Sequence, residues 1–234
     1  MTAAFILDEL LSMAHPEKAA FLQRFFKTGP GQYAEGDVFL GLVVPLTRNI
    51  AKVNKQTPLA ELQRLIESPY HEARLCALLI LVEQFKKASP EERKDRYDFY
   101  LANTSRINNW DLVDLTCPHV VGAYLADKDR SPLYTLARSG HLWEERIAIV
   151  STITFIRRGE YEDTLALADY FLTHPHDLIH KAVGWMLREV GKKDRETLTA
   201  FLESRAVRLP RTALRYAIEH YPEEQRQYFL KKKR

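Results

Sequence analysis

The chain contains 234 residues, of which 46% are hydrophobic and 28% are charged. This composition excludes an intrinsically disordered chain, and no apolar run approaches the roughly 20 residues of a transmembrane helix. The formal net charge of +3 does not by itself establish nucleic-acid binding, but the 34 Lys and Arg residues allow one basic face if they segregate.

The first segment, MTAAFILDELLSMAHPEK, has the spacing of an amphipathic helix. It lacks the basic region and long apolar stretch of a secretory signal, so we expect no signal peptide. The two cysteines, Cys76 and Cys117, both stand beside apolar residues. They are expected to be buried free thiols in a reducing compartment, which favours the cytoplasm.

Helical periodicity runs through the rest of the chain, and strand signals are scarce. Several helices are expected to start at a Ser-Pro pair or a similar pair. Ser is a good N-cap, and proline fits the first helical turn. These starts are SPYHEARL at 68, SPEERKD at 89, SPLYTLA at 131, HPHDLIH at 174 and YPEEQRQ at 221. The pattern predicts about twelve to fourteen helices. Residues 27–41, with four glycines and one proline, are the exception and are expected to form a long loop.

Three stretches resemble one another: HEARLCALLIL, WEERIAIVSTI and IHKAVGWMLRE. Arg74 and Arg146 then lie 72 residues apart, with Trp110 halfway and Lys181 another 35 residues on. A unit of about 36 residues predicts an all-α chain, an α-solenoid of HEAT-like antiparallel helix pairs with a concave groove. We expect residues 1–234 to form one such domain. The basic KKKR at 231–234 is expected to be a flexible solvated tail that adds at most non-specific phosphate attraction.

The stretch NNWDLVD holds a tryptophan and a carboxylate one helical turn apart, Trp110 and Asp114. Asn108 or Asn109 is expected to cap this helix, with Asp111 in its first turn, where the helix dipole favours an anion. The repeat register places Trp110 and Asp114 on one concave surface together with two residues of later repeats, Arg146 and Trp185. The spacing alone leaves open a simpler interpretation, a packing aromatic beside a solvated acid.

Common catalytic motifs are absent from the sequence: it has no P-loop, GxGxxG, HExxH or paired CxxC. His176 and His180 stand four residues apart without an evident third ligand, so we expect no metal site. One carboxylate, two tryptophans and one arginine suit a reaction that builds positive charge near an anionic phosphate. Indole faces attract cations, a carboxylate stabilises an oxocarbenium-like centre, and arginine binds phosphate in bidentate fashion.

The chain resembles the AlkD family of bacterial DNA alkylation repair enzymes, which are HEAT-like-repeat DNA glycosylases. The similarity spans nearly the whole chain, and the family's active-site positions fall on Trp110, Asp114, Arg146 and Trp185. The resembling segments are PEKAAFLQRFFK at 16–27, FLGLVVPLTRNIAK at 39–52, NWDLVD at 109–114, LWEERIAIV at 142–150, KAVGWMLREVGK at 181–192 and RTALRYAIEH at 211–220.

The resemblance implies a substrate and a reaction. The substrate would be double-stranded DNA with a cationic alkylated purine, N3-methyladenine or N7-methylguanine, and the N-glycosidic bond would be hydrolysed without metal, cofactor or lyase chemistry. Asp114 would be the catalytic carboxylate, Trp110 and Trp185 would pack against the lesion sugar and backbone, and Arg146 would hold a phosphate. The base would stay in the stack. The protein would be a cytoplasmic monomer, associated with the bacterial nucleoid when bound to DNA.

Basic residues are expected to line the DNA groove, although each has a solvated helix face as its alternative. Two residues of the glycine-rich loop, which is longer than in the family's best-known form, are candidates as well. The predicted DNA-binding residues are Lys27, Tyr33, Arg48, Lys181, Arg188, Lys192, Lys193, Arg211 and Arg215.

A second hypothesis is a non-catalytic helical-repeat module that binds DNA structures or a protein partner. The family includes members with reduced or no base-excision activity, and Asn109 stands where some relatives carry a second aromatic. Asp114 distinguishes the two hypotheses, because a phosphate-binding groove gains nothing from a carboxylate that repels DNA.

Overall fold

A computed structural model describes residues 1–232, and the described chain is helical apart from one isolated bridge between Val38 and Tyr70. The predicted all-α class is confirmed, with helix pairs that follow one another as in an α-solenoid. The chain forms two compact units, residues 1–120 and 121–234, and each is described by itself. The expectation of a single domain stays a prediction.

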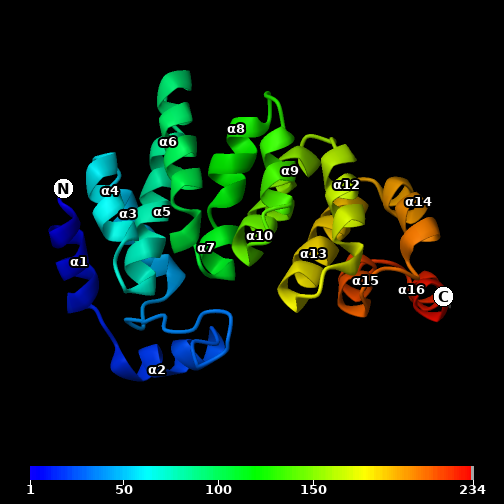
Figure 1. The fold of residues 1–234 in the computed structure, drawn as a ribbon, viewed down its shortest axis with the longest axis horizontal. Helices are drawn as coiled ribbons and strands as arrows, with labels where there is room; N and C mark the ends of the chain where they lie inside the picture. The colour runs from blue at the N-terminus through cyan, green and yellow to red at the C-terminus, as the bar shows by residue number, and fades with distance from the viewer. Residues whose placement is uncertain (233–234) are drawn as a thin grey trace. The chain divides into compact units, whose positions relative to one another are not determined.

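The first unit contains seven of the α-helices and the long predicted loop (Figure 1). Between α2 and α3 the chain forms turns without a helix, which confirms the loop at residues 27–41. A 3-10 turn, Thr104–Arg106, precedes the last of these helices. The helices are α1 (Ala3–Ser12), α2 (Pro16–Phe25), α3 (Val44–Val53), α4 (Leu59–Ile66), α5 (His71–Phe85), α6 (Pro90–Ala102) and α7 (Trp110–Asp114).

Helix α5 is the centre of the first unit. It packs against α1, α3, α4, α6 and α7, and every residue from His71 to Val82 is buried. A helix that is apolar along most of its length and buried on all sides is expected to lie in a core. Its first turn nevertheless carries His71, Glu72 and Arg74, so these charged side chains need partners inside the protein.

Helix α2 differs from α5 in that none of its residues is buried. It lies below the other helices of the first unit in Figure 1. The chain before α2 is held by a hydrogen bond from the His15 amide to the Leu40 carbonyl oxygen, at 2.8 Å. Gly41 sits at this contact with a φ of +90°, and a side chain there would clash with the His15 carbonyl oxygen.

The second unit is built around α13, which packs against α10, α12, α14 and α15. Gly184 permits the close approach of α15, because a Cβ at this position would lie 2.6 Å from the Ala213 carbonyl oxygen. The helices are α8 (Ala123–Leu125), α9 (Ser131–Ala137), α10 (Leu142–Ser151), α11 (Ile153–Ile156), α12 (Glu162–Tyr170), α13 (Asp177–Lys193), α14 (Arg195–Arg205), α15 (Arg211–Ala217) and α16 (Glu223–Lys231).

The repeat interval is visible along the chain. Helices α5, α7, α10, α13 and α15 begin at intervals of 39, 32, 35 and 34 residues. Fourteen of the sixteen α-helices in the described chain are five residues or longer, which agrees with the expected twelve to fourteen helices. The two shorter ones are α8 and α11. No described helix is both long and apolar enough to cross a membrane.

Most of the predicted helix starts, and the predicted state of the two cysteines, agree with the structure. Ser89 caps α6 through a reciprocal bond pattern with Glu92, whereas α5 begins at His71, later than its Ser-Pro signal predicts. Cys76 and Cys117 are buried free thiols, as predicted. Of the basic tail, Lys231 ends α16 and the Lys232 Nζ donates to the Glu203 carbonyl oxygen at 3.1 Å, while residues 233–234 lie outside the described chain.

The close contact between Gly41 and the chain at the start of α2 can be tested by replacing two glycines of the loop separately. Gly36 and Gly41 both have positive φ, but a side chain at Gly36 meets open space. Gly36→Ala should cost about 1–2 kcal/mol for the left-handed backbone alone. Gly41→Ala should cost clearly more, because the methyl group also meets the backbone before α2. Urea unfolding of both variants measures the difference, and equal costs would contradict the close contact.

Candidate functional site

Helix α7 carries the first pair of predicted site residues, Trp110 and Asp114, at its two ends. The helix is confirmed, and its cap is Asn109, whose side-chain oxygen accepts a hydrogen bond from the Trp110 amide at 2.9 Å. Trp110 and Asp114 are both partly exposed. Asp111, between them, is buried, so two carboxylates of the same short helix have different surroundings.

An aromatic stack holds the Trp110 indole. Phe26 lies almost parallel to it, with ring centroids 5.0 Å apart and an angle of 18° between the planes. Phe25, at the end of α2, meets the indole edge-on at 6.1 Å. Phe26 stacks in turn on Phe39 at 4.9 Å. Trp110 therefore packs on rings from α2 and the loop after it, which fixes its orientation.

A buried ion network lies beneath this stack. The His71 Nδ1 lies 3.0 Å from an Asp37 carboxylate oxygen, and the His71 Nε2 lies 2.8 Å from an Asp111 carboxylate oxygen. The Arg74 guanidinium also donates to Asp37, and it bonds Asn108 at 3.1 Å. The network thus connects the loop, α5 and the first turn of α7.

The network shifts the pKa of two of its members. Burial alone would lower the pKa of His71, but the carboxylates of Asp111 and Asp37 raise it to about 9. Burial would raise the pKa of Asp37, but hydrogen bonds and charge from His71 and Arg74 hold it below its usual value. At neutral pH the imidazole is therefore a cation between two anions.

Glu72 provides a second buried link to the loop. Its carboxylate accepts hydrogen bonds from the successive backbone amides of Leu40, Gly41 and Leu42, at 2.8, 2.9 and 3.1 Å. A carboxylate that takes three amide hydrogens satisfies donors that a loop would otherwise leave buried and unpaired. Helix α5 thus anchors the loop through Glu72 as well as through His71.

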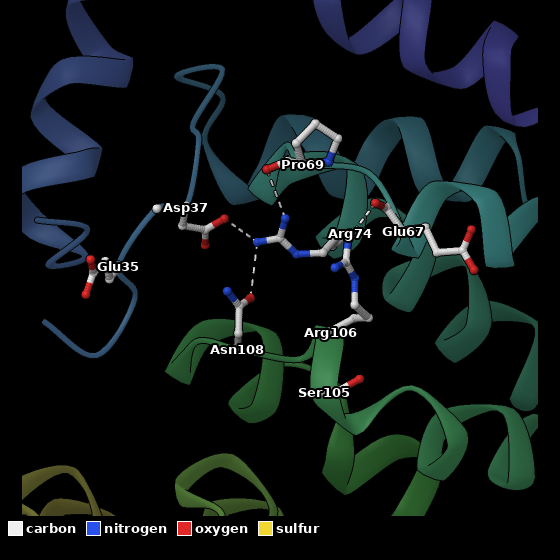
Figure 2. Close-up of a pocket in the computed structure, with 9 residues that line it drawn as sticks. Glu35, Asp37, Glu67, Pro69, Arg74, Ser105, Arg106 and Asn108 are labelled. Carbon is white, nitrogen blue, oxygen red and sulfur yellow. Dashed lines mark hydrogen bonds and ion pairs between the residues drawn. The ribbon is translucent and has the colours of Figure 1, made fainter. Parts of the chain in front are cut away.

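A cavity of about 280 Å³ lies at the edge of this network, and Figure 2 shows the residues that line it. Arg74 lies at its centre, with bonds to Asp37, Asn108 and the Pro69 carbonyl oxygen. Arg106 lies beside it and donates to the carbonyl oxygen of Glu67 at 2.5 Å. Most of the polar lining is thus engaged within the protein, and the cavity carries three acidic and two basic side chains.

The second unit holds the other pair of predicted site residues. Arg146, on α10, is 5% exposed, and its Nη1 donates to the Leu178 carbonyl oxygen at 2.5 Å, in the first turn of α13. Trp185 lies further along α13 and is partly exposed. The convergence of this pair with Trp110 and Asp114 on one surface stays a prediction.

Four of the predicted DNA-binding residues lie on α13, three of them on the helix face that carries Trp185. Lys181 pairs with Asp177 at 2.8 Å and Lys192 with Glu189 at 2.7 Å, while Arg188 pairs with Glu219. Lys193 is exposed at the end of the helix. These pairs are at the surface, where an ion pair contributes little and a phosphate can compete for the cation.

The remaining predicted DNA-binding residues lie on other elements. Arg211 and Arg215 are exposed on α15, and Arg211 donates to the Leu230 carbonyl oxygen at 3.1 Å. Arg48 is partly exposed on α3. Lys27 and Tyr33 lie in the loop, where Lys27 is exposed with a φ of +58° and Tyr33 is partly exposed. Their contact with DNA stays a prediction.

Three histidines of the second unit, His174, His176 and His180, make local contacts. The His176 Nδ1 accepts from the Leu178 amide at 3.1 Å, and His180 contacts the His174 carbonyl oxygen at 2.5 Å. Among residues 1–232 no three His, Cys, Asp or Glu side chains are grouped so that they could hold a metal ion.

Sequence reasoning missed the roles of Asp37 and His71. A signal for part of the network was present, because HEAR precedes an apolar run of eight residues, and charges at the start of a core helix require partners. Nothing in the sequence identified Asp37, which lies 34 residues before His71 in a loop without periodicity.

Comparison with known proteins identifies the family. The model of the DNA alkylation repair enzyme family matches residues 6–221. The chain belongs to the DNA alkylation repair enzyme family. A solved structure described as a predicted DNA alkylation repair enzyme from Enterococcus faecalis is similar in fold, with 19% identity, a TM-score of 0.69, and coverage of 90% of this chain and 97% of that one. No functionally curated protein matches significantly.

Membership in the DNA alkylation repair enzyme family gives the chain a role in alkylation repair, with DNA as the molecule acted on. The match includes α7 and α13, the helices that carry both tryptophans of the predicted site. It also includes the loop and α5, so the residues of the buried network lie within the matched segment.

The buried network makes stability depend on pH. The pKa of His71 is raised to about 9 in the fold, so its contribution is complete below about 6.5, the pKa in the unfolded chain, and is lost as the pH rises through about 9. The loss should be at most about 3 kcal/mol. Urea unfolding between pH 6 and 10 measures it, and His71→Gln should flatten this decline. An equal decline in both proteins would contradict the charged imidazole.

Proposed function

We propose that the protein is a monofunctional DNA glycosylase that releases cationic alkylated purines, N3-methyladenine and N7-methylguanine, from double-stranded DNA. The observation that carries the proposal is the contrast between the two acids of α7. Asp111 is buried and bound to His71, whereas Asp114 is partly exposed one turn from the Trp110 indole. A partly exposed carboxylate one helical turn from a partly exposed indole suits stabilisation of a cation.

The second unit contributes the residues that hold the nucleotide. Trp185 offers a second indole face on α13, next in space to the cations of Lys181 and Arg188 on the same side of the helix. Arg146, fixed by Leu178 at the first turn of α13, receives a backbone phosphate. We infer from the repeat register that both pairs act on one lesion nucleotide.

The chemistry requires no metal and no general acid. The bond between C1′ and the base nitrogen breaks, and its electron pair leaves with the base, which becomes neutral. Positive charge develops on the deoxyribose, where the Asp114 carboxylate and the two indole faces stabilise it. Water then bonds to C1′ and loses a proton to solvent or to Asp114, which leaves an abasic site.

Selectivity in this proposal comes from the leaving group. An alkylated purine with a positive charge departs readily, so the protein need not flip the base into a pocket as many glycosylases do. The base stays stacked while the protein contacts the sugar and the phosphates. The basic side chains of α13 and α15, together with Arg48, Lys27 and Tyr33, contact the duplex backbone. The protein acts as a monomer in the cytoplasm, associated with the bacterial nucleoid when bound to DNA.

The first test replaces the carboxylate without changing its size. Asp114→Asn should abolish release of N7-methylguanine from a duplex oligonucleotide in the presence of EDTA, while its affinity for the duplex persists. Asp98→Asn, which removes an exposed acid of α6, should leave release unchanged. Release by neither wild type nor variant, with tight duplex binding by both, would favour the non-catalytic binding module.

Separate substitutions of two tryptophans test whether Trp185 faces the ligand. Trp185→Ala should slow base release with little loss of stability, because this side chain is partly exposed. Trp143→Ala, at a position that is 5% exposed, should cost about 3–5 kcal/mol of stability. Release assays and thermal unfolding of both variants check this. An equally large loss of stability in Trp185→Ala would assign that indole to packing.

A further inference from the structure

His71 connects three elements of the first unit through one ring. It extends from α5, its Nδ1 contacts Asp37 of the loop at 3.0 Å, and its Nε2 contacts Asp111 of α7 at 2.8 Å. The His71 side chain is 2% exposed, so water does not compete for either contact. His71 therefore links α7 directly to the loop, in addition to Arg74, which bonds Asp37 and Asn108.

The same ring belongs to the stack that ends on Trp110. Phe39 lies over the imidazole with centroids 4.2 Å apart and an angle of 19° between the planes. Phe26 stacks on Phe39, and it also stacks on Trp110 with ring centroids 5.0 Å apart. Asp111 is the neighbour of Trp110 in α7, so the imidazole is linked to the indole through the rings and through the helix.

Both contacts of His71 require its charged form. A neutral imidazole has one N–H, so it can donate to Asp37 or to Asp111, and the other carboxylate then faces a ring nitrogen that also only accepts. The imidazolium has two N–H groups and satisfies both acids. The other charged groups around it are Arg74, which also binds Asp37, and Glu72, whose carboxylate is turned toward the amides of residues 40–42.

We propose that His71, as a buried imidazolium, is a positioning residue for base release: it holds α7 so that Trp110 and Asp114 meet the lesion nucleotide. This inference rests on the proposed glycosylase function. Loss of the proton breaks one of the two bonds, so α7 and the indole lose their fixed placement above the pH at which the ring titrates. That pH is high, because Asp111 and Asp37 raise the pKa of the ring to about 9.

The kinetic test is the pH profile of base release under single-turnover conditions. The wild-type rate should be constant from pH 6 to 8 and fall as the pH passes about 9. His71→Gln should release the base on the order of 10- to 100-fold more slowly at pH 7, with little change in duplex affinity, and should lack the alkaline fall. His220→Gln, at an exposed histidine, should behave as wild type.

A second variant keeps the proposal testable if His71→Gln does not fold. Asp111→Asn retains the ring but removes the carboxylate that contributes most to raising its pKa. The alkaline fall of the rate should then begin at lower pH. An alkaline limit at the same pH in Asp111→Asn and wild type would overturn the proposal.

A substrate-free measurement separates this proposal from the proposed function. In protein labelled with 5-fluorotryptophan, the fluorine resonance of Trp110, assigned by its absence in Trp110→Phe, should shift with a midpoint near pH 9. The shift should be missing in His71→Gln, or should move to lower pH in Asp111→Asn. A shift without any base release would show that His71 controls the placement of Trp110 and would refute the glycosylase. Base release with a Trp110 resonance that does not titrate with His71 would overturn the positioning role.

Discussion

The structure of the first unit depends on the pairing of the buried charged side chains at the start of α5. The helix is buried along nearly its whole length, yet it begins with His71, Glu72 and Arg74. Each unpaired charge in such a position would cost several kcal/mol. The loop supplies the partners, an acid at Asp37 and three free amides at residues 40–42, and α7 supplies Asp111. The long loop is therefore a structural part of the core and not only a connection.

This constraint extends to the candidate site. The acid that satisfies His71 lies one residue after Trp110, and the aromatic rings that cover the imidazole also support the indole. The two carboxylates of α7 therefore have different surroundings. Asp111 completes the buried network, and Asp114 is partly exposed. The second unit follows a simpler plan, in which α13 presents Trp185 and its basic neighbours on one side and a buried apolar stripe on the other.

Much of the fold could be predicted from the sequence because helical periodicity and caps are local. An asparagine cap before Trp110, the helix that follows it and the loop at 27–41 all follow from residues close together in the chain. The repeat interval of about 36 residues follows from the similarity of three segments. The start of α5 was misplaced because Ser68 and Pro69 form a turn before the helix, in which Ser68 accepts from the Tyr70 amide. The network of Asp37, His71 and Asp111 could not be predicted, because its partners lie 34 and 40 residues apart.

The central proposal is that Trp110, Asp114, Arg146 and Trp185 act on one nucleotide of damaged DNA. A structure of the protein bound to a duplex with a stable, uncleavable cationic nucleotide tests it most directly. The account predicts that the lesion deoxyribose lies against Trp110 and Trp185, with the Asp114 carboxylate facing C1′ and Arg146 on an adjacent phosphate. A lesion sugar that contacts neither tryptophan, or an Asp114 side chain turned away from the DNA, would contradict the account.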